Sequence, residues 1–184
     1  MTVYKKSEAV QLTKNFSSKE FKCKCKNSDC TTTTINSNLP KQLQKIRNHF
    51  NKPVVINSGY RCAKHNKAVG GATYSKHRLG QAADIVVKGV PALEVARYCE
   101  TIGIKGIGLY ETFVHVDTRT KKSFWYSSKQ YYRSTFLEKK TLRQVAEDVI
   151  DGVYGTGAAR KKKLEAAGYN YSEVQALVNE LLRK

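Results

Sequence analysis

The chain has 184 residues, 40% of them hydrophobic, and its 33 lysines and arginines against 15 aspartates and glutamates give a formal net charge of +18. This length can bury one core, or one core and a small appendage, and no apolar run is long enough to span a bilayer. The charge favours a polyanionic partner, either nucleic acid or an anionic cell wall. No helix-turn-helix, RNP or zinc-finger spacing accompanies it, and a solvated basic surface without a dedicated partner is the alternative.

The N-terminal part predicts little regular structure. Residues 1–14 are polar and weakly patterned, which indicates a loosely docked arm. Ser17 or Ser18 can cap a short helical turn that ends near Phe21, with Phe16 and Phe21 as core residues. The cysteine-rich segment after it and the threonine run at 31–34 are predicted to form a loop.

The middle of the chain alternates predicted helices and strands. Apolar residues at helical spacing predict an amphipathic helix over 39–50, with Pro40 in its first turn. A short buried strand follows at 54–56. Another strand is expected at 83–87, and a second helix at 90–99.

A hairpin is predicted where residues 106–110 pair with residues 113–118 around Glu111 and Thr112. The glycines of its first strand suit a close backbone approach or a bulge. Trp125 is expected to close the sheet or to line a substrate groove.

His77 and Asp84 suggest a metal site. They flank a glycine-containing loop that leads into an apolar strand, and an imidazole and a carboxylate are ordinary zinc ligands. Catalytic zinc uses three protein ligands and keeps one position open, and His115, in a stretch of alternating apolar and polar residues, can supply the third. The alternative is that these histidines are satisfied by hydrogen bonds alone; His49 and His65 are expected to have surface or structural roles.

A proton-transferring carboxylate is expected beside this site. Residues two apart in a strand share a face, so His115 and Asp117 project together, along with Phe113 and Glu111. Asp117 is the first choice for the general base and Glu111 the second. Asp117 could instead orient an imidazole.

The chain has five cysteines, and no apolar segment resembling a signal peptide precedes them. Disulfides are therefore not expected. Cys23, Cys25 and Cys30, with Cys62 as a fourth ligand, could hold a second, structural zinc. The alternative is that they are reduced thiols in an N-terminal loop.

Four blocks of sequence, in order, resemble the M15 family of zinc D,L-peptidases of bacterial cell walls, in the group of D-Ala-D-Ala carboxypeptidases and phage endolysins. The blocks are Ser58-Gly59-Tyr60-Arg61, the stretch 65–72 (HNKAVGGA), Ser75-x-His77-x-x-Gly80-x-Ala82-x-Asp84, and 106–110 (GIGLY) with 113–119 (FVHVDTR). The resemblance runs from about Asn15 to Trp125. It implies an α+β fold, a small antiparallel sheet with flanking helices carrying a zinc site, and hydrolysis of peptide bonds in peptidoglycan.

The resemblance also implies roles for single residues. Arg61 would point into the active site, where a guanidinium can bind a substrate carbonyl or an oxyanion; the alternative is a structural pair with a carboxylate. Ser75 would hold the substrate's carboxylate. Many relatives carry an acidic residue three positions before the ligand histidine, but this chain has Thr112 there, so the general base is open between Asp117 and Glu111.

The C-terminal quarter predicts three short helices with glycine stops and resembles the CW_7 (Cpl-7-type) cell-wall-binding repeat, including its Gly-x-Gly-x-x-Arg and Ala-Gly-Tyr strings. The likeness makes four residues candidates for glycan contact, with core positions as the alternative for the two tyrosines: Tyr154, Gly155, Arg160 and Tyr169. A single repeat should bind weakly, so avidity from the enzyme domain or weak self-association is expected.

Together these features predict a peptidase domain at 1–126, a linker at 127–140 and a wall-binding domain at 141–184. The predicted function is that of an endolysin, cytoplasmic until host lysis, with Zn²⁺ as cofactor and peptidoglycan rather than nucleic acid as partner. The alternative is a non-catalytic basic protein that binds cell wall or nucleic acid on the same scaffold. The bond cut is open: L-Ala-D-Glu, a cross-bridge bond and terminal D-Ala-D-Ala are all compatible.

Overall fold

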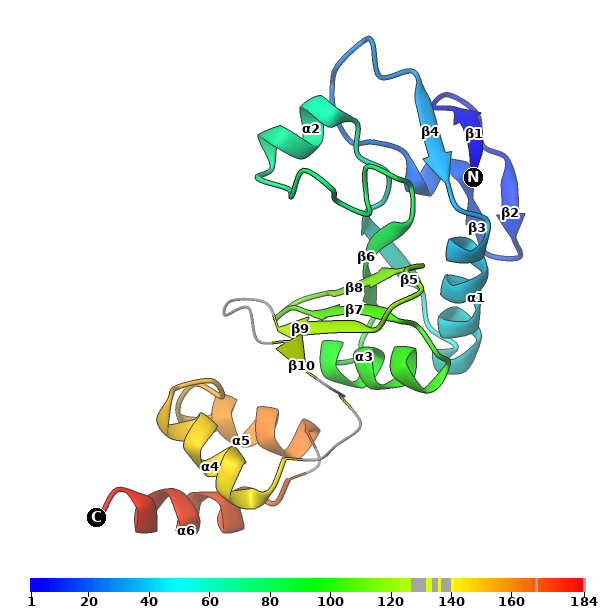
Figure 1. The fold of residues 1–184 in the computed structure, drawn as a ribbon. Coiled ribbons are helices and arrows are strands. Elements are labelled where there is room, and N and C mark those ends of the chain that lie inside the picture. Colours follow the sequence, from blue (N-terminus) through cyan, green and yellow to red (C-terminus); the bar gives the residue numbers. More distant parts are fainter. Residues whose placement is uncertain (127–131, 134–135, 137–139, 168, 184) are drawn as a thin grey trace. The chain divides into compact units, whose positions relative to one another are not determined.

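The computed structural model describes residues 1–126, 132–133, 136, 140–167 and 169–183, which fall into two compact units, residues 1–136 and 137–184 (Figure 1). The larger unit combines helices with a β-sheet and the smaller one is helical, in agreement with the predicted α+β class. In the part of the chain that the structure describes, no helix has the length and apolar character needed to cross a membrane.

The larger unit is organised around a six-stranded sheet with the order β10-β9-β7-β8-β6-β5. Its neighbouring strands are antiparallel except for β7 and β9, which are parallel. The strands are β5 (Val54–Ser58), β6 (Ala82–Val87), β7 (Gly106–Leu109), β8 (Val114–Asp117), β9 (Ser123–Tyr126) and β10 (Tyr132–Arg133). The predicted hairpin is confirmed, since β7 pairs with β8 and the Tyr110 amide donates to the Phe113 carbonyl at 3.0 Å.

Helices α1 (Asn38–Phe50) and α3 (Ala92–Thr101) cover one face of this sheet (Figure 1). Both helices were predicted from the spacing of their apolar residues. Alternate strand residues point towards them because successive side chains in a strand face opposite ways. The resulting core joins residues of both helices to those of the central strands: Leu39, Leu43, Ile46, Ile85, Val87, Val95, Ala96, Ile107, Leu109, Val114 and Val116. The intervening residues of β6, β8, β7 and β9 therefore lie on the opposite face.

The N-terminal residues are more ordered than predicted. Strand β1 (Thr2–Lys5) pairs with β4 (Thr32–Ile35), and β2 (Gln11–Thr13) pairs with β3 (Phe16–Ser17). The predictions of a loosely docked arm and of a threonine loop were therefore wrong. Threonine is β-branched and favours extended backbone, but a strand also needs a partner. The partner of the threonine-rich strand β4 is β1, about thirty residues earlier in the chain.

A 3₁₀ helix, η1 (Ser18–Phe21), confirms the predicted helical turn. The backbone N–H of Ser17 donates to Glu20 Oε2 at 2.7 Å, which satisfies an amide at the start of the turn. Phe16 and Phe21 are both buried, as predicted. After η1, residues 22–31 contain neither helix nor strand, and the short helix α2 (Ala63–Ala68) follows β5.

The larger unit continues to Phe136, beyond the predicted domain end at residue 126. Phe136 is buried against Phe124, its N–H donates to Glu100 Oε2 at 2.6 Å, and its carbonyl accepts from Arg97 Nε at 3.1 Å. Most of the predicted linker, 127–140, lies outside the described residues.

The smaller unit consists of α4 (Leu142–Ile150), α5 (Gly157–Ala166) and α6 (Tyr171–Leu181), which confirms the prediction of three short helices. Gly152 follows α4 with a φ of 78°, a left-handed conformation that glycine adopts without strain and that ends a helix. The interior of the smaller unit is formed by apolar residues from all three helices: Val145, Val149, Leu164, Val174 and Val178.

Candidate metal centre

The sheet face away from α1 and α3 carries a row of functional side chains. The strand register aligns Ser58 with Asp84, Asp84 with His115, His115 with Gly108, and Gly108 with Trp125. The row thus crosses five strands, and residues that are neighbours in it come from separate parts of the chain. The sequence pattern predicted only that His115 and Asp117 share a face, which their hydrogen bond confirms.

His77 reaches this row from the loop before β6. Its Nε2 lies 3.2 Å from Asp84 Oδ1 and 3.2 Å from His115 Nδ1, and His115 Nδ1 lies 2.9 Å from Asp84 Oδ1. A tetrahedral zinc with bonds of about 2.0–2.2 Å holds its ligand atoms about 3.3 Å apart. The three predicted ligand atoms therefore have nearly the mutual spacing that one zinc ion requires. Among the described residues, two groups of His, Cys, Asp or Glu side chains could hold a metal: this triad and a cluster of cysteines.

The protons on the two imidazoles are fixed by groups outside the triad. His77 Nδ1 lies 2.7 Å from the Gly59 carbonyl, which can only accept, so Nδ1 carries the proton and Nε2 presents its lone pair. His115 Nε2 lies 3.1 Å from Asp117 Oδ2 and donates to it in the same way, which frees Nδ1. Two lone pairs and a carboxylate oxygen thus converge, and this donor set fits a zinc ion.

Arg61 fixes the carboxylate of the triad. Its Nη2 donates to Asp84 Oδ2 at 2.6 Å and its Nε donates to Ser58 Oγ at 2.7 Å, which leaves Oδ1 of Asp84 turned towards the two histidines. Burial alone would raise the pKa of Asp84, but the close contacts with the His115 and His77 rings outweigh it and hold that pKa well below its usual range. Asp84 is therefore an anion at neutral pH, and the contact of Arg61 matches the structural alternative considered for this residue.

Asp117 is completely buried and lies at the Nε2 edge of His115, not at the Nδ1 edge that faces His77 and Asp84. Arg119 binds it through the backbone N–H at 3.0 Å and through the side chain, with Nε at 2.8 Å from Oδ1 and Nη2 at 2.6 Å from Oδ2. Burial opposes ionisation, but the contacts with His115 and Arg119 lower the pKa of Asp117 well below its usual range. This placement favours the orienting role for Asp117 over the predicted role as general base.

The glycines of β7 make room for this arrangement, as their predicted close approach implied. A Cβ at Gly106 would lie 2.1 Å from Asp117 Oδ1, and a Cβ at Gly108 would lie 2.4 Å from the Trp125 ring. Trp125 is partly buried and its ring centroid lies 5.1 Å from that of His115. The indole therefore lies against the imidazole of His115.

Burial alone would lower the pKa of His115, but the two carboxylates in contact with its ring, Asp117 and Asp84, outweigh this and raise it. Both contacts favour a positive charge on the ring. A divalent cation bound at Nδ1 would place its charge at the same spot, between the ring and Asp84.

Two further predicted residues lie on the chain segments that carry the triad, without joining it. Glu111 is exposed in the turn between β7 and β8, on the hairpin that carries His115. Ser75 Oγ accepts from the backbone N–H of His77 at 3.3 Å, so it supports the loop that holds this ligand.

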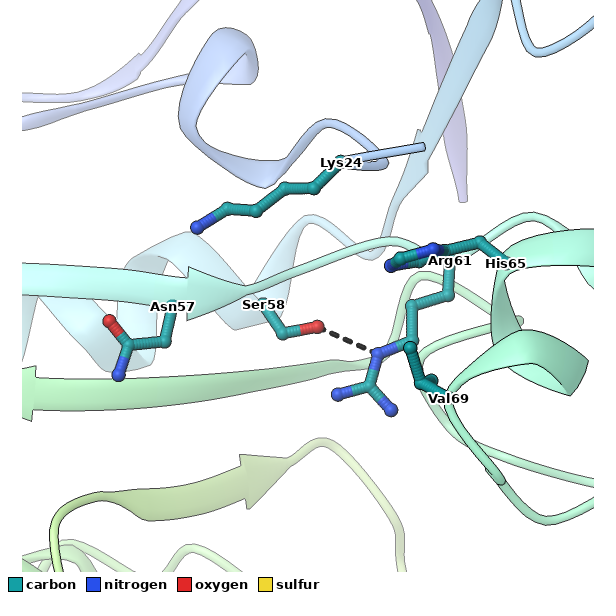
Figure 2. A pocket seen from close by; sticks show the side chains of 6 residues that line it. All are labelled: Lys24, Asn57, Ser58, Arg61, His65 and Val69. Atoms are coloured by element: carbon teal, nitrogen blue, oxygen red, sulfur yellow. Dashed lines mark hydrogen bonds between the residues drawn. The ribbon is translucent and has the colours of Figure 1, made fainter. Parts of the chain in front are cut away.

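A pocket of about 330 Å³ borders the site on the Arg61 side (Figure 2). Its lining includes Lys24, Arg61 and His65, together with Asn57, Ser58 and Val69. Except for Arg61, the sequence did not single out these residues for the site. Lys24 reaches the pocket only because the irregular segment 22–31 folds back towards β5, where Lys24 Nζ lies 3.4 Å from the Ile56 carbonyl.

In the smaller unit, the predicted glycan-binding residues differ in exposure. Tyr169 is buried, with 9% of its surface exposed, and this matches the core alternative. Tyr154 is partly exposed. Arg160 Nε donates to the Gly155 carbonyl at 2.8 Å and its Nη1 donates to Gln175 Oε1 at 3.2 Å, so Arg160 ties the turn before α5 to α6.

Comparison with known proteins finds one family in each of the two compact units. Residues 14–117 match the family model of peptidase M15, and residues 143–182 match that of the CW_7 repeat. The chain is also 36% identical over 94 residues to a probable peptidoglycan L,D-endopeptidase, MepK, of Haemophilus influenzae, with 46% of this chain and 50% of that protein covered. The chain thus spans about half the length of this curated relative. It belongs to the peptidase M15 family and carries a CW_7 repeat in its C-terminal unit.

Proposed function

We propose that this protein is a zinc-dependent peptidase that hydrolyses peptide bonds of peptidoglycan. The observation that carries the proposal is the convergence of His77 Nε2, Asp84 Oδ1 and His115 Nδ1 within 3.2 Å of one another. Membership of the peptidase M15 family supports peptide hydrolysis, and the likeness to a probable peptidoglycan endopeptidase of Haemophilus influenzae supports peptidoglycan as the substrate.

A zinc ion held by His77, Asp84 and His115 would supply Lewis acidity, which would lower the pKa of a water to about 7 and polarise a carbonyl. Arg61, Asp117 and the Gly59 carbonyl each orient one ligand through its second polar atom. In this proposal Arg61 and Asp117 are positioning residues. Glu111 is the proton-transferring base, since it is the exposed carboxylate of the two that the sequence offered.

The pocket beside Arg61 is proposed to receive a carboxylate of the stem peptide. Lys24 and Arg61 give it positive charge, which suits the substrate carboxylate that the family likeness implies. Ser75, which the family likeness assigns to substrate binding, would contribute its hydroxyl from the loop that carries His77.

Release of peptides from purified peptidoglycan tests this function. The full chain, reconstituted with zinc, is expected to release soluble peptides. Chelation is expected to stop the release and added zinc to restore it. Mass spectrometry of products from a defined muropeptide then identifies the bond. Undiminished release after complete metal removal, or none from fully zinc-loaded protein, would overturn the proposal in favour of a non-catalytic wall-binding protein.

The C-terminal unit is proposed to attach the enzyme to the cell wall. Tyr154 offers a partly exposed ring next to the turn that Arg160 holds through Gly155, and aromatic faces and guanidinium donors both suit sugars. Tyr154→Ala is expected to weaken co-sedimentation with purified walls. Tyr171→Ala, at another partly buried tyrosine of the same unit, is the matched control, and equal binding by both variants would contradict this placement.

We further propose an endolysin role, with synthesis in the cytosol and access to the wall through a membrane lesion made by another protein. Expression inside bacteria is then expected to lyse cells only when a pore-forming protein is co-expressed. Lysis without any pore would contradict it.

A further inference from the structure

Four of the five cysteines meet in one cluster of the larger unit. Cys23, Cys25 and Cys30 come from the segment between η1 and β4, and Cys62 comes from the start of α2. Their Sγ atoms all lie within 4.8 Å of one another, and none of the four forms a disulfide. The fifth cysteine, Cys99, lies apart in the hydrophobic core.

The sulfur spacing is that of metal ligands. Cys25 Sγ and Cys62 Sγ are 3.7 Å apart, whereas a disulfide bond is about 2.0 Å long. Four zinc–sulfur bonds of about 2.3 Å in a tetrahedron separate neighbouring sulfurs by about 3.8 Å. The cluster therefore needs little adjustment to hold one zinc ion.

Three of the four sulfurs have a hydrogen-bond donor beside them. The backbone N–H of Cys62 donates to Cys23 Sγ, and that of His65 donates to Cys62 Sγ, both at 3.4 Å. Lys6 Nζ lies 3.6 Å from Cys25 Sγ and 3.1 Å from the Cys25 carbonyl. Amide donors and a cation stabilise negative sulfur, and a zinc ion with four thiolates keeps a net negative charge that Lys6 opposes.

The segment that carries three of these cysteines has little else to order it. Residues 22–31 form no helix or strand, and their other side chains are polar or charged. Even so, Cys23 and Cys30 are buried. Ordering ten residues costs about 1–2 kcal/mol each in backbone entropy, and a metal bound by three side chains of the segment can offset much of that cost.

We propose that Cys23, Cys25, Cys30 and Cys62 bind a structural zinc ion, separate from the centre at His77, Asp84 and His115. Four protein ligands close the coordination sphere, so this ion has no open position for a substrate. The site does not depend on the proposed peptidase function.

The cysteine site adjoins the groups that orient the other metal centre. Cys62 directly follows the residues 59–61, in which the Gly59 carbonyl fixes His77 and Arg61 fixes Asp84. The same residues pack on the backbone before Cys23, since the Tyr60 N–H donates to the Phe21 carbonyl at 2.7 Å and a Cβ at Gly59 would lie 2.6 Å from that oxygen. A structural zinc bound to Cys23 and Cys62 would thus hold the two chain segments that meet in this contact.

Metal content and cobalt spectra of the full, reduced chain test the proposal. The wild-type protein is expected to bind two zinc ions per chain, and its Co²⁺ form to show intense sulfur-to-cobalt charge-transfer bands. Cys62→Ser is expected to lose one metal and most of the band intensity. His77→Ala is expected to lose the other metal and keep the bands. Cys99→Ala, a cysteine outside the cluster, is the matched control and should keep both metals.

Absence of charge-transfer bands in the reduced, Co²⁺-loaded wild-type protein would overturn the proposal, and so would bands that survive Cys62→Ser and Cys25→Ser. The wild-type spectrum decides even where a cysteine variant does not fold. Because the bands report only thiolate ligation, their presence in a protein without peptidase activity would sink the proposed function and leave this site standing.

Discussion

His77, Asp84 and His115 lie on or beside strands of the central sheet, whereas Cys23, Cys25 and Cys30 lie in a segment without helix or strand. In the first cluster, each ligand is held by a hydrogen bond from outside the triad. In the second cluster, the sulfurs mainly contact one another and accept hydrogen bonds from a few backbone amides. The first site is thus preformed by the fold, while the order of the second depends on what the sulfurs bind.

The number of ligands separates the two sites further. Three protein ligands beside a pocket leave room for a substrate, and four leave none. Loss of the sheet site should therefore remove chemistry and spare the fold, and loss of the cysteine site should loosen residues 22–31 and leave the sheet in place. The following predictions test this contrast.

The largest effect is expected for His115→Ala. It removes one of three ligands, so zinc at the sheet site and peptide release should both fall to background. The unfolding midpoint should change by only a few degrees, because the strands hold β8 in place. Metal analysis, a peptidoglycan assay and thermal unfolding measure the three quantities. His49→Ala, at a histidine that stacks on Tyr98 away from the site, should leave all three unchanged.

Glu111→Gln is expected to lower kcat by about 10²–10⁴-fold with zinc content unchanged, since it removes a proton acceptor and no ligand. Glu94→Gln, at an exposed position of α3, is the control. If Glu111→Gln retains full activity and Asp117→Asn loses it at unchanged zinc content, then Asp117 is the base and the orienting role proposed for it is wrong.

Arg61→Lys should reduce zinc affinity at the sheet site by about 10–100-fold. Lysine keeps the charge but cannot bond Ser58 and Asp84 at once with the geometry of a guanidinium. Competition with a chromophoric chelator measures the affinity, and activity should recover at saturating zinc. Because Arg61 also lines the pocket proposed for the substrate carboxylate, a loss that persists there with a raised KM would assign the larger part of its effect to substrate binding rather than to zinc affinity. Arg47→Lys on α1 serves as the control.

The sequence predicted that His77, Asp84 and His115 meet, and it predicted helices α1 and α3, because each of these features depends on side chains that are visible in the chain. The apolar spacing of α1 and the histidine–aspartate string before β6 are examples. It missed β1 and β4, since each strand exists through a partner about thirty residues away. It also missed the Gly59 carbonyl that fixes His77, because a backbone group leaves no trace in residue types. The role of Asp117 was open for a similar reason, as it depends on which edge of His115 the carboxylate meets.

The smallest and most local effect is expected for Cys25→Ser in hydrogen exchange. Without zinc at the cysteine site, amides of residues 22–31 should lose protection and open with a free energy near zero, since few other contacts order them. Amides of β6 and β8 should keep their protection, because the sheet register does not pass through the cysteines. His115→Ala supplies the reciprocal comparison, with residues 22–31 still protected. If both variants instead exchange alike throughout the larger unit, the two clusters do not differ in how the fold holds them, and the contrast between a preformed site and a metal-ordered one fails.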